Sequence, residues 1–145
     1  MSKPVHIESS KQFDELLSSN TYVLVDFTAS WCPPCKMIAP IFEQLSVANS
    51  KEGSFTFVKV DVDEQREIAS KYKISAMPTF ILLKDGEQVQ SVRGANPPAI
   101  QTLVKSAVSD IEKAQIEKKE EPSTEESTVS GSYTLSSNSN WKTSL

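Results

Sequence analysis

The pattern of hydrophobic and polar residues predicts five strands in the first part of the chain. Residues 22–29 and 55–62 are continuous apolar runs rich in β-branched residues, which is typical of strands buried on both faces. Residues 5–9 predict a shorter strand. Residues 77–84 and 88–94, separated by a turn, predict an antiparallel hairpin.

Between and after these strands, the spacing of apolar residues predicts four helices. The first carries Phe13, Leu16 and Leu17 on one face, with Ser9 or Ser10 as its cap. The others are expected from the cysteines to about Asn49, from Asp63 to about Tyr72, and from Pro97 onward with Asn96 as cap. This order predicts an α/β fold with a mixed central sheet and helices on both of its faces.

The composition changes after residue 111, which gives three regions. Residues 1–111 hold all the predicted elements and form one domain. Residues 112–121 are highly charged and extend the last helix or act as a linker. In residues 122–145, 12 of 24 residues are Ser or Thr, so we expect a disordered tail. Trp141 is an exception in this tail, and one hypothesis is that it docks on the protein surface in cis or in trans.

Charge and hydropathy restrict the function. The net charge of −4 gives no indication of binding to nucleic acid or to an anionic membrane. No run approaches the roughly 18 apolar residues of a membrane span. The N-terminal residues have no apolar core of a secretory signal. We therefore expect a cytoplasmic or nuclear protein, in which a close cysteine pair is catalytic or metal-binding rather than structural.

The only two cysteines are Cys32 and Cys35, and three kinds of site use such a pair. A zinc site needs four ligands, and only His6 and carboxylates are available to complete it. A structural disulfide would close a very small loop and remove little chain entropy. Dithiol redox chemistry is favoured, because the pair follows a buried strand and precedes a helix.

The position of the pair predicts a role for each cysteine. A helix N-terminus favours the thiolate, which is the form that attacks a disulfide. Cys32 lies just ahead of the helix, so we expect it to be exposed and to act as the nucleophile. Cys35 lies one turn further, so we expect it to be shielded and to resolve the mixed disulfide.

Four segments of the chain carry a resemblance to a known family. VLVDFTASWCPPCKMIAPIFEQL, FVKVDVDE, AMPTF and VRGA resemble thioredoxins, and the resemblance covers about residues 5 to 110. It implies the thioredoxin fold, the reduction of disulfides in target proteins, and regeneration by an NADPH-dependent thioredoxin reductase. It implies no bound cofactor and no metal.

Pro33 departs from the family pattern, because thioredoxins typically have Gly at this place. Pro33 and Pro34 both lack an N–H, so the N–H of Cys35 is the donor left for the Cys32 sulfur. A residue before a proline is disfavoured in the helical region, so we expect the helix to begin at Pro34. We also expect Pro33 to shift the reduction potential of the pair; the alternative is a tolerated variant without such an effect.

Asp26 interrupts an apolar strand that leads to the cysteines. A buried carboxyl without a partner has a raised pKa, and Asp26 can then take the Cys35 proton through a water. The alternative is an Asp that faces solvent. By resemblance, Lys59 is a buried lysine near Asp26; the alternative is a surface lysine whose stem packs on the sheet.

The resemblance also implies a target-binding surface. Pro78 would follow a cis peptide bond opposite the cysteines, which leaves the backbone of Met77 free to pair with an extended target. Trp31, Pro33, Pro34, Met77, Gly94 and Ala95 would form an apolar rim. Gly94 is also explained as a simple turn glycine.

These observations predict a protein-disulfide reductase that works by dithiol–disulfide exchange through Cys32 and Cys35. The alternative from another class is a redox-dependent adaptor that recruits partners through the thioredoxin surface and the C-terminal tail.

Overall fold

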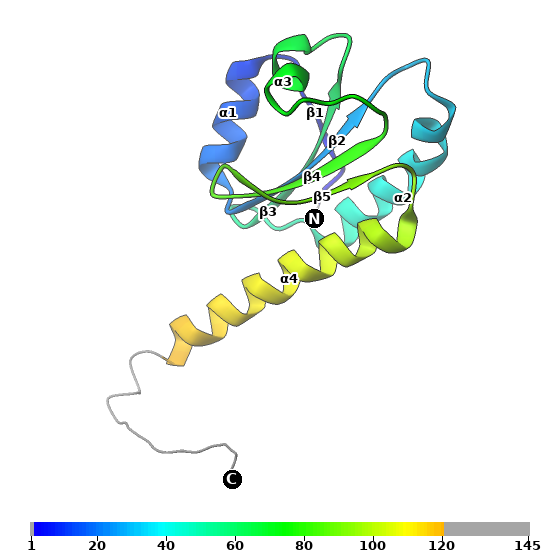
Figure 1. Cartoon of the computed structure of the whole chain (residues 1–145). Coiled ribbons are helices and arrows are strands. Elements are labelled where there is room, and N and C mark those ends of the chain that lie inside the picture. Colours follow the sequence, from blue (N-terminus) through cyan, green and yellow to red (C-terminus); the bar gives the residue numbers. More distant parts are fainter. Residues whose placement is uncertain (1, 121–145) are drawn as a thin grey trace. The chain divides into compact units, whose positions relative to one another are not determined.

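The computed structural model describes residues 2–120, and the side chains of residues 2–114 (Figure 1). Nine elements follow one another along the chain: β1 (Val5–His6), α1 (Ser10–Ser19), β2 (Tyr22–Thr28), α2 (Pro33–Asn49), β3 (Phe55–Asp61), α3 (Arg66–Lys71), β4 (Thr79–Lys84), β5 (Glu87–Arg93) and α4 (Pro97–Glu120). Their order is the order that the hydrophobic pattern predicts. No helix within these described residues has the length and hydropathy needed to cross a membrane.

The five strands form one mixed sheet in the order β1-β3-β2-β4-β5. β1, β3 and β2 are parallel, whereas β4 runs antiparallel to β2 and β5 antiparallel to β4. The carboxyl ends of β2 and β3 therefore lie at the same edge as the start of β4. This edge leads directly into the cysteine segment and into the turn before β4.

The two faces of the sheet are covered by different helices. On one face, Phe13 of α1 and Ile68 of α3 pack in a cluster with Val25, Val58 and other buried strand residues. On the other face, the ring of Phe42 in α2 lies 5.5 Å from that of Phe57 in β3. Figure 1 shows α1 and α3 on one side of the sheet and α2 on the other.

The helix starts follow from local capping. Ser9 Oγ accepts a hydrogen bond from the Gln12 N–H at 3.1 Å, and Asn96 Oδ1 accepts one from the Ala99 N–H at 3.2 Å. The expected start of α3 at Asp63 is wrong. Asp61 Oδ1 accepts from the N–H groups of Asp63 and Glu64, so these residues form a turn and the helix begins only at Arg66.

The residues up to Ser109 form one compact unit, and a second unit begins at Asp110. The first contains the whole sheet, and the described part of the second is the end of α4. The predicted domain limit at residue 111 and the predicted extension over 112–121 stay predictions. The predicted disorder of 122–145, the docking of Trp141 and the tail of the adaptor hypothesis lie outside the described residues.

Candidate active site

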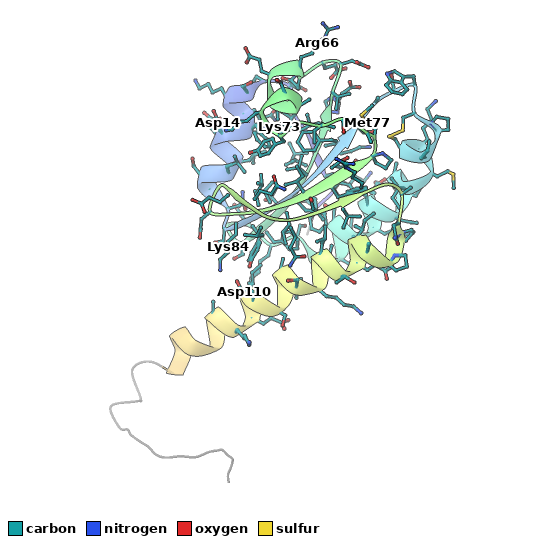
Figure 2. All side chains as sticks on the ribbon, viewed as in Figure 1. Asp14, Arg66, Lys73, Met77, Lys84 and Asp110 are labelled. Carbon is teal, nitrogen blue, oxygen red and sulfur yellow. A yellow bond between two sulfur atoms is a disulfide. The ribbon has the colours of Figure 1, made fainter. Side chains whose placement is uncertain are left out.

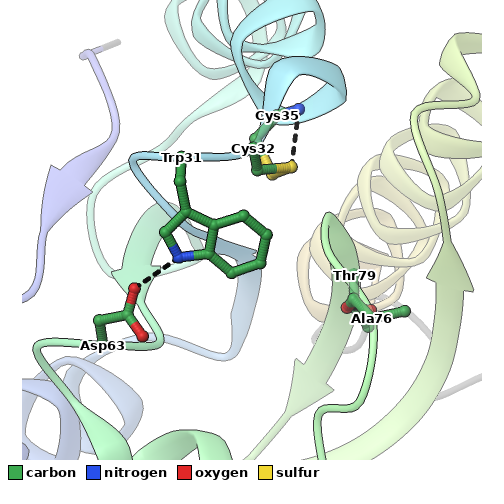
Figure 3. The surroundings of a disulfide bond; sticks show 6 residues. All are labelled: Trp31, Cys32, Cys35, Asp63, Ala76 and Thr79. Atoms are coloured by element: carbon green, nitrogen blue, oxygen red, sulfur yellow. Dashed lines mark hydrogen bonds between the residues drawn. A yellow bond between two sulfur atoms is a disulfide. The ribbon is translucent and has the colours of Figure 1, made fainter.

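Cys32 and Cys35 form a disulfide at the start of α2, with their Cα atoms 5.3 Å apart. Cys32 is the N-cap of the helix, and its sulfur accepts a hydrogen bond from the Cys35 N–H at 3.2 Å (Figure 3). This is the one donor that the two prolines leave in the first turn. The N-terminus of α2 therefore places a backbone N–H and its positive dipole end at the Cys32 sulfur.

Two sequence-based expectations about this turn are wrong. The helix begins at Pro33 and not at Pro34, because the ring of Pro33 holds its own φ near the helical value and a first helical residue needs no N–H. The extended residue is instead Cys32, with φ −102° and ψ 106°. Cys32 is also no more exposed than Cys35, since each is 3% exposed and Val62 and Met77 pack against the pair.

Asp26 lies near the middle of β2 and is only 1% exposed. Its register partners are Lys59 on β3 and Phe80 on β4, and side chains paired in this way project from the same face of the sheet. The ring of Phe80 lies 5.7 Å from that of Phe42 in α2. Asp26 therefore faces the layer of α2, the helix that carries Cys35.

The surroundings of Asp26 change its acidity. Burial raises the pKa of the Asp26 carboxyl from 3.8 to about 7, and the positive charge of Lys59 lowers it in part. Asp26 Oδ1 has no hydrogen-bond partner in the part of the chain that the structure describes. A carboxyl with this pKa gains and loses a proton near neutral pH, as a general acid–base group must.

A pocket of about 230 Å³ opens beside Cys35 on the same side of the sheet. Thr28 and Lys59 line it, and Thr28 is two residues beyond Asp26 on the same face of β2. Lys59 is half-buried, between the two alternatives raised by the sequence. His6 lines the same pocket, with its Nε2 3.1 Å from Glu64 Oε1. The pocket gives water a place next to Cys35.

The Met77–Pro78 peptide bond is cis. Thr79 Oγ1 donates to the Ala76 carbonyl at 2.7 Å, and the Gly94 N–H donates to the Pro78 carbonyl at 2.7 Å. Met77 packs against the cysteine cluster. Figure 2 shows Met77 just before the start of β4, whereas Lys84 lies at the other end of this strand. The turn before β4 is thus fixed from both sides and lies against the disulfide.

Gly94 has a φ of +92°, and a Cβ built at this position would meet nothing within 4 Å. The backbone conformation therefore accounts for a glycine here, as the turn alternative expects. Ala95 follows it and is half-buried, whereas Pro33 and Pro34 are exposed. The hydrogen bond from the Gly94 N–H to the Pro78 carbonyl places Gly94 next to the turn in which Met77 packs against the cysteines.

Trp31 is 62% exposed, although its ring is large and apolar. Its Nε1–H donates to Asp63 Oδ2 at 2.8 Å, and Figure 3 shows the indole between Asp63 and the cysteine pair. The sequence pattern gives no indication of this role of Asp63. The two residues are 32 positions apart, so no local pattern links them.

No group of three or more His, Cys, Asp or Glu side chains within residues 2–114 has the geometry to hold a metal ion. The two cysteines are joined to each other in the disulfide. The zinc alternative therefore has no ligand set in this described part of the chain.

The comparisons with known proteins agree with this geometry. The thioredoxin family model matches residues 4–108. The chain is 50% identical over 97 residues to a thioredoxin-like protein of Fusarium culmorum, and the match covers 63% of this chain and 80% of that protein. It is 43% identical over 100 residues to thioredoxin-1 of Schizosaccharomyces pombe, with 69% and 94% covered.

A solved structure of the thioredoxin pre-protein of Schistosoma mansoni superimposes with a TM-score of 0.67 and 43% identity, and covers 74% of this chain and all of that one. The sheet order, the helices on both faces and the Cys-x-x-Cys pair at the head of α2 are therefore those of the thioredoxin fold. This chain belongs to the thioredoxin family and is a thiol–disulfide oxidoreductase that reduces protein disulfides.

Proposed function

We propose that Cys32 is the nucleophile of this reductase and that Cys35 is the resolving cysteine. The Cys32 thiolate attacks a target disulfide, forms a mixed disulfide and expels one target sulfur as a thiolate. Cys35 then attacks Cys32 Sγ, closes the Cys32–Cys35 disulfide and releases the second target thiolate. Two electrons pass from the dithiol to the target. The observation that carries this assignment is the N-cap position of Cys32, where the Cys35 N–H donates to its sulfur.

Asp26 accepts the proton of Cys35 during the resolving step, through a water between the two side chains. Two observations support this role: the carboxyl faces the helix that carries Cys35, and its pKa is about 7. Lys59 acts as a positioning residue, since its positive charge keeps the pKa of Asp26 from rising further. The proton on Asp26 returns to Cys35 when the disulfide is reduced again.

The target binds around the disulfide on a surface formed by Trp31, Pro33, Pro34, Met77, Pro78, Gly94 and Ala95. The packing of Met77 against the cysteines supports this surface, and so does the exposure of Trp31. An extended target segment pairs with the backbone of Met77 next to the cis bond, as in strand addition. Backbone pairing accepts many sequences, which suits a reductase of several target proteins.

The electrons come from an NADPH-dependent thioredoxin reductase, and the reaction takes place in the cytoplasm or the nucleus. Support for this donor comes from the family membership. A reducing compartment suits this role, because it keeps the dithiol available to reduce its targets. The cysteine pair is the redox centre in this scheme, and the dithiol itself carries the electrons without a bound cofactor.

Two serine variants test the assignment of the cysteines. Cys32→Ser is expected to abolish the reduction of insulin, because no thiolate is left to start the exchange. Cys35→Ser is expected to accumulate a mixed disulfide between Cys32 and the target, which non-reducing electrophoresis detects as a larger species. Turnover by Cys32→Ser, or a mixed disulfide formed through Cys35, would overturn the assignment.

A further inference from the structure

Met37 is the most prominent apolar side chain near the redox centre that the proposed function does not use. It is 74% exposed, more than Trp31 at 62% and Val47 at 43%. A methionine this exposed loses the stabilisation that burial would provide. It lies one helical turn beyond the two prolines that follow Cys32.

The periodicity of α2 places Met37 on the same face as Pro33 and Pro34. Met37 follows them by four and three residues. All three side chains are exposed. Cys35, which lies between the prolines and Met37, and Ile38, which follows Met37, are buried. A side chain in a helix leans toward the helix N-terminus. This lean would carry the Met37 side chain over the first turn, toward the prolines and the Cys32 end.

We propose that Met37 is a specificity residue that receives a large apolar side chain of the target, two or three positions from the reacting target cysteine. This inference rests on the proposed function, because it takes Cys32 as the atom that the target must reach. It extends the binding surface of Trp31, Pro33 and Pro34 along the exposed face of α2.

The position on the target follows from simple geometry. Met37 lies five residues after Cys32, which is about 7.5 Å along a helix that rises 1.5 Å per residue. An extended target chain advances about 3.3 Å per residue. For a target chain that runs along the axis of α2, a residue reaches the level of Met37 when it is two or three positions from the cysteine whose sulfur bonds to Cys32.

A methionine is suited to this task. Its unbranched thioether side chain has several rotatable bonds and adapts to partners of different shape. A family member that acts on several targets needs such a surface, because a rigid pocket would restrict it to one side chain. The expected preference is therefore for large apolar residues in general, and not for one residue type.

Two synthetic peptides test the inference with the reduced full-length chain. Each carries one cysteine in a disulfide with a chromogenic aromatic thiol, which leaves when Cys32 attacks the peptide sulfur. One peptide has Leu at the second and third positions on both sides of the cysteine, and the other has Ser at these positions. The second-order rate constant of thiol release is measured for both.

Wild type is expected to react about fivefold faster with the Leu peptide, which is the size of effect that partial burial of one such contact gives. Met37→Gln should lose this preference, so that the ratio of its two rate constants falls to about one, and a urea unfolding curve like that of the wild type shows that the variant is folded. Val47→Gln, an exposed apolar residue further along the same helix, should keep the preference.

The outcomes separate this inference from the function on which it rests. A wild type without preference, or a Met37→Gln variant that still prefers the Leu peptide, would overturn the role of Met37 and leave the cysteine assignment intact. Reaction of Cys32→Ser with either peptide would overturn the cysteine assignment itself.

Discussion

Asp26 of β2 is paired directly with Lys59 of β3, and the positive charge of Lys59 opposes the effect of burial on the pKa of Asp26. Burial raises the pKa of the Asp26 carboxyl to about 7, and the lysine charge limits that rise. The pairing follows from the parallel register of two central strands. The acidity of Asp26 is therefore set by the sheet, and it can be tested through the stability of the fold.

Asp26→Asn is expected to stabilise the protein at pH 8 and not at pH 4. The folded-state pKa of about 7 lies above the ordinary value of 3.8, so the folded protein holds this proton more tightly than the unfolded chain. The free energy of unfolding of the wild type therefore falls as the pH rises from about 4 to about 7. At about 1.4 kcal/mol per pH unit, the full effect is on the order of 4 kcal/mol.

Urea denaturation of both proteins at the two pH values measures this effect. The amide side chain has its own cost of burial, but this cost is the same at both pH values and cancels in the comparison. A difference in stability that does not change between pH 4 and pH 8 would contradict the raised pKa.

Lys59→Met tests the other side of the pairing. Methionine keeps much of the length of the side chain and removes the positive charge, so the pKa of Asp26 is expected to rise above about 7. The fall in stability with pH should then extend to higher pH than in the wild type. Lys59→Arg keeps the charge and is the matched control; it should follow the wild-type curve. Equal curves for all three proteins would show that Lys59 has no influence on Asp26.

Asp63→Ala is expected to lower kcat/KM for the reduction of insulin several-fold. The variant removes the acceptor of the Trp31 Nε1–H, so the exposed indole loses its fixed position beside the disulfide. The loss of stability should be about 1 kcal/mol or less, because the hydrogen bond is exposed to water. Asp63→Asn keeps an acceptor oxygen and should retain most of the activity. If both variants kept wild-type kinetics, the position of the indole would not matter for catalysis.

The order of the elements could be predicted because each strand and helix has a local signal. The run at residues 22–29, the alternation of turns and strands after Pro78, and the Asn96 cap are all contained in short segments. Asp26 could also be identified as a candidate site residue, since a lone carboxyl in an otherwise apolar strand is unfavourable for folding and points to a functional role.

The parts of the site that the sequence did not predict depend on contacts between distant segments. The Trp31–Asp63 hydrogen bond needs the turn after β3 to meet the start of α2. The low exposure of Cys32 depends on Val62 and Met77, which pack from two other loops against the cluster that contains both cysteines. The predicted start of α2 at Pro34 is wrong for a local reason. Two proline rules conflict at Pro33, and the sequence alone does not show which one dominates.

Pro33→Gly is expected to lower the free energy of unfolding by about 0.4–1 kcal/mol, because glycine gives the unfolded chain more conformations to lose. It also restores an N–H in the first turn of α2, next to the N-cap sulfur of Cys32. The reduction potential of the pair, measured against glutathione, should therefore differ between the two proteins. If the two potentials are equal, the additional proline has no influence on the redox chemistry.

Gly94→Ala is expected to reduce stability and activity for two different reasons. At φ +92° an alanine is strained by about 1–2 kcal/mol, although its Cβ would contact nothing within the protein. The same Cβ would stand where an extended target approaches the backbone next to Pro78, so kcat/KM for protein disulfides should fall.

Gly53→Ala is the matched control: its φ is +80°, its added Cβ also meets nothing, and it lies before β3 at the other end of the sheet. Both variants should lose similar stability, but only Gly94→Ala should lose activity toward insulin. Equal activities of the two variants would leave Gly94 with the role of a turn residue alone.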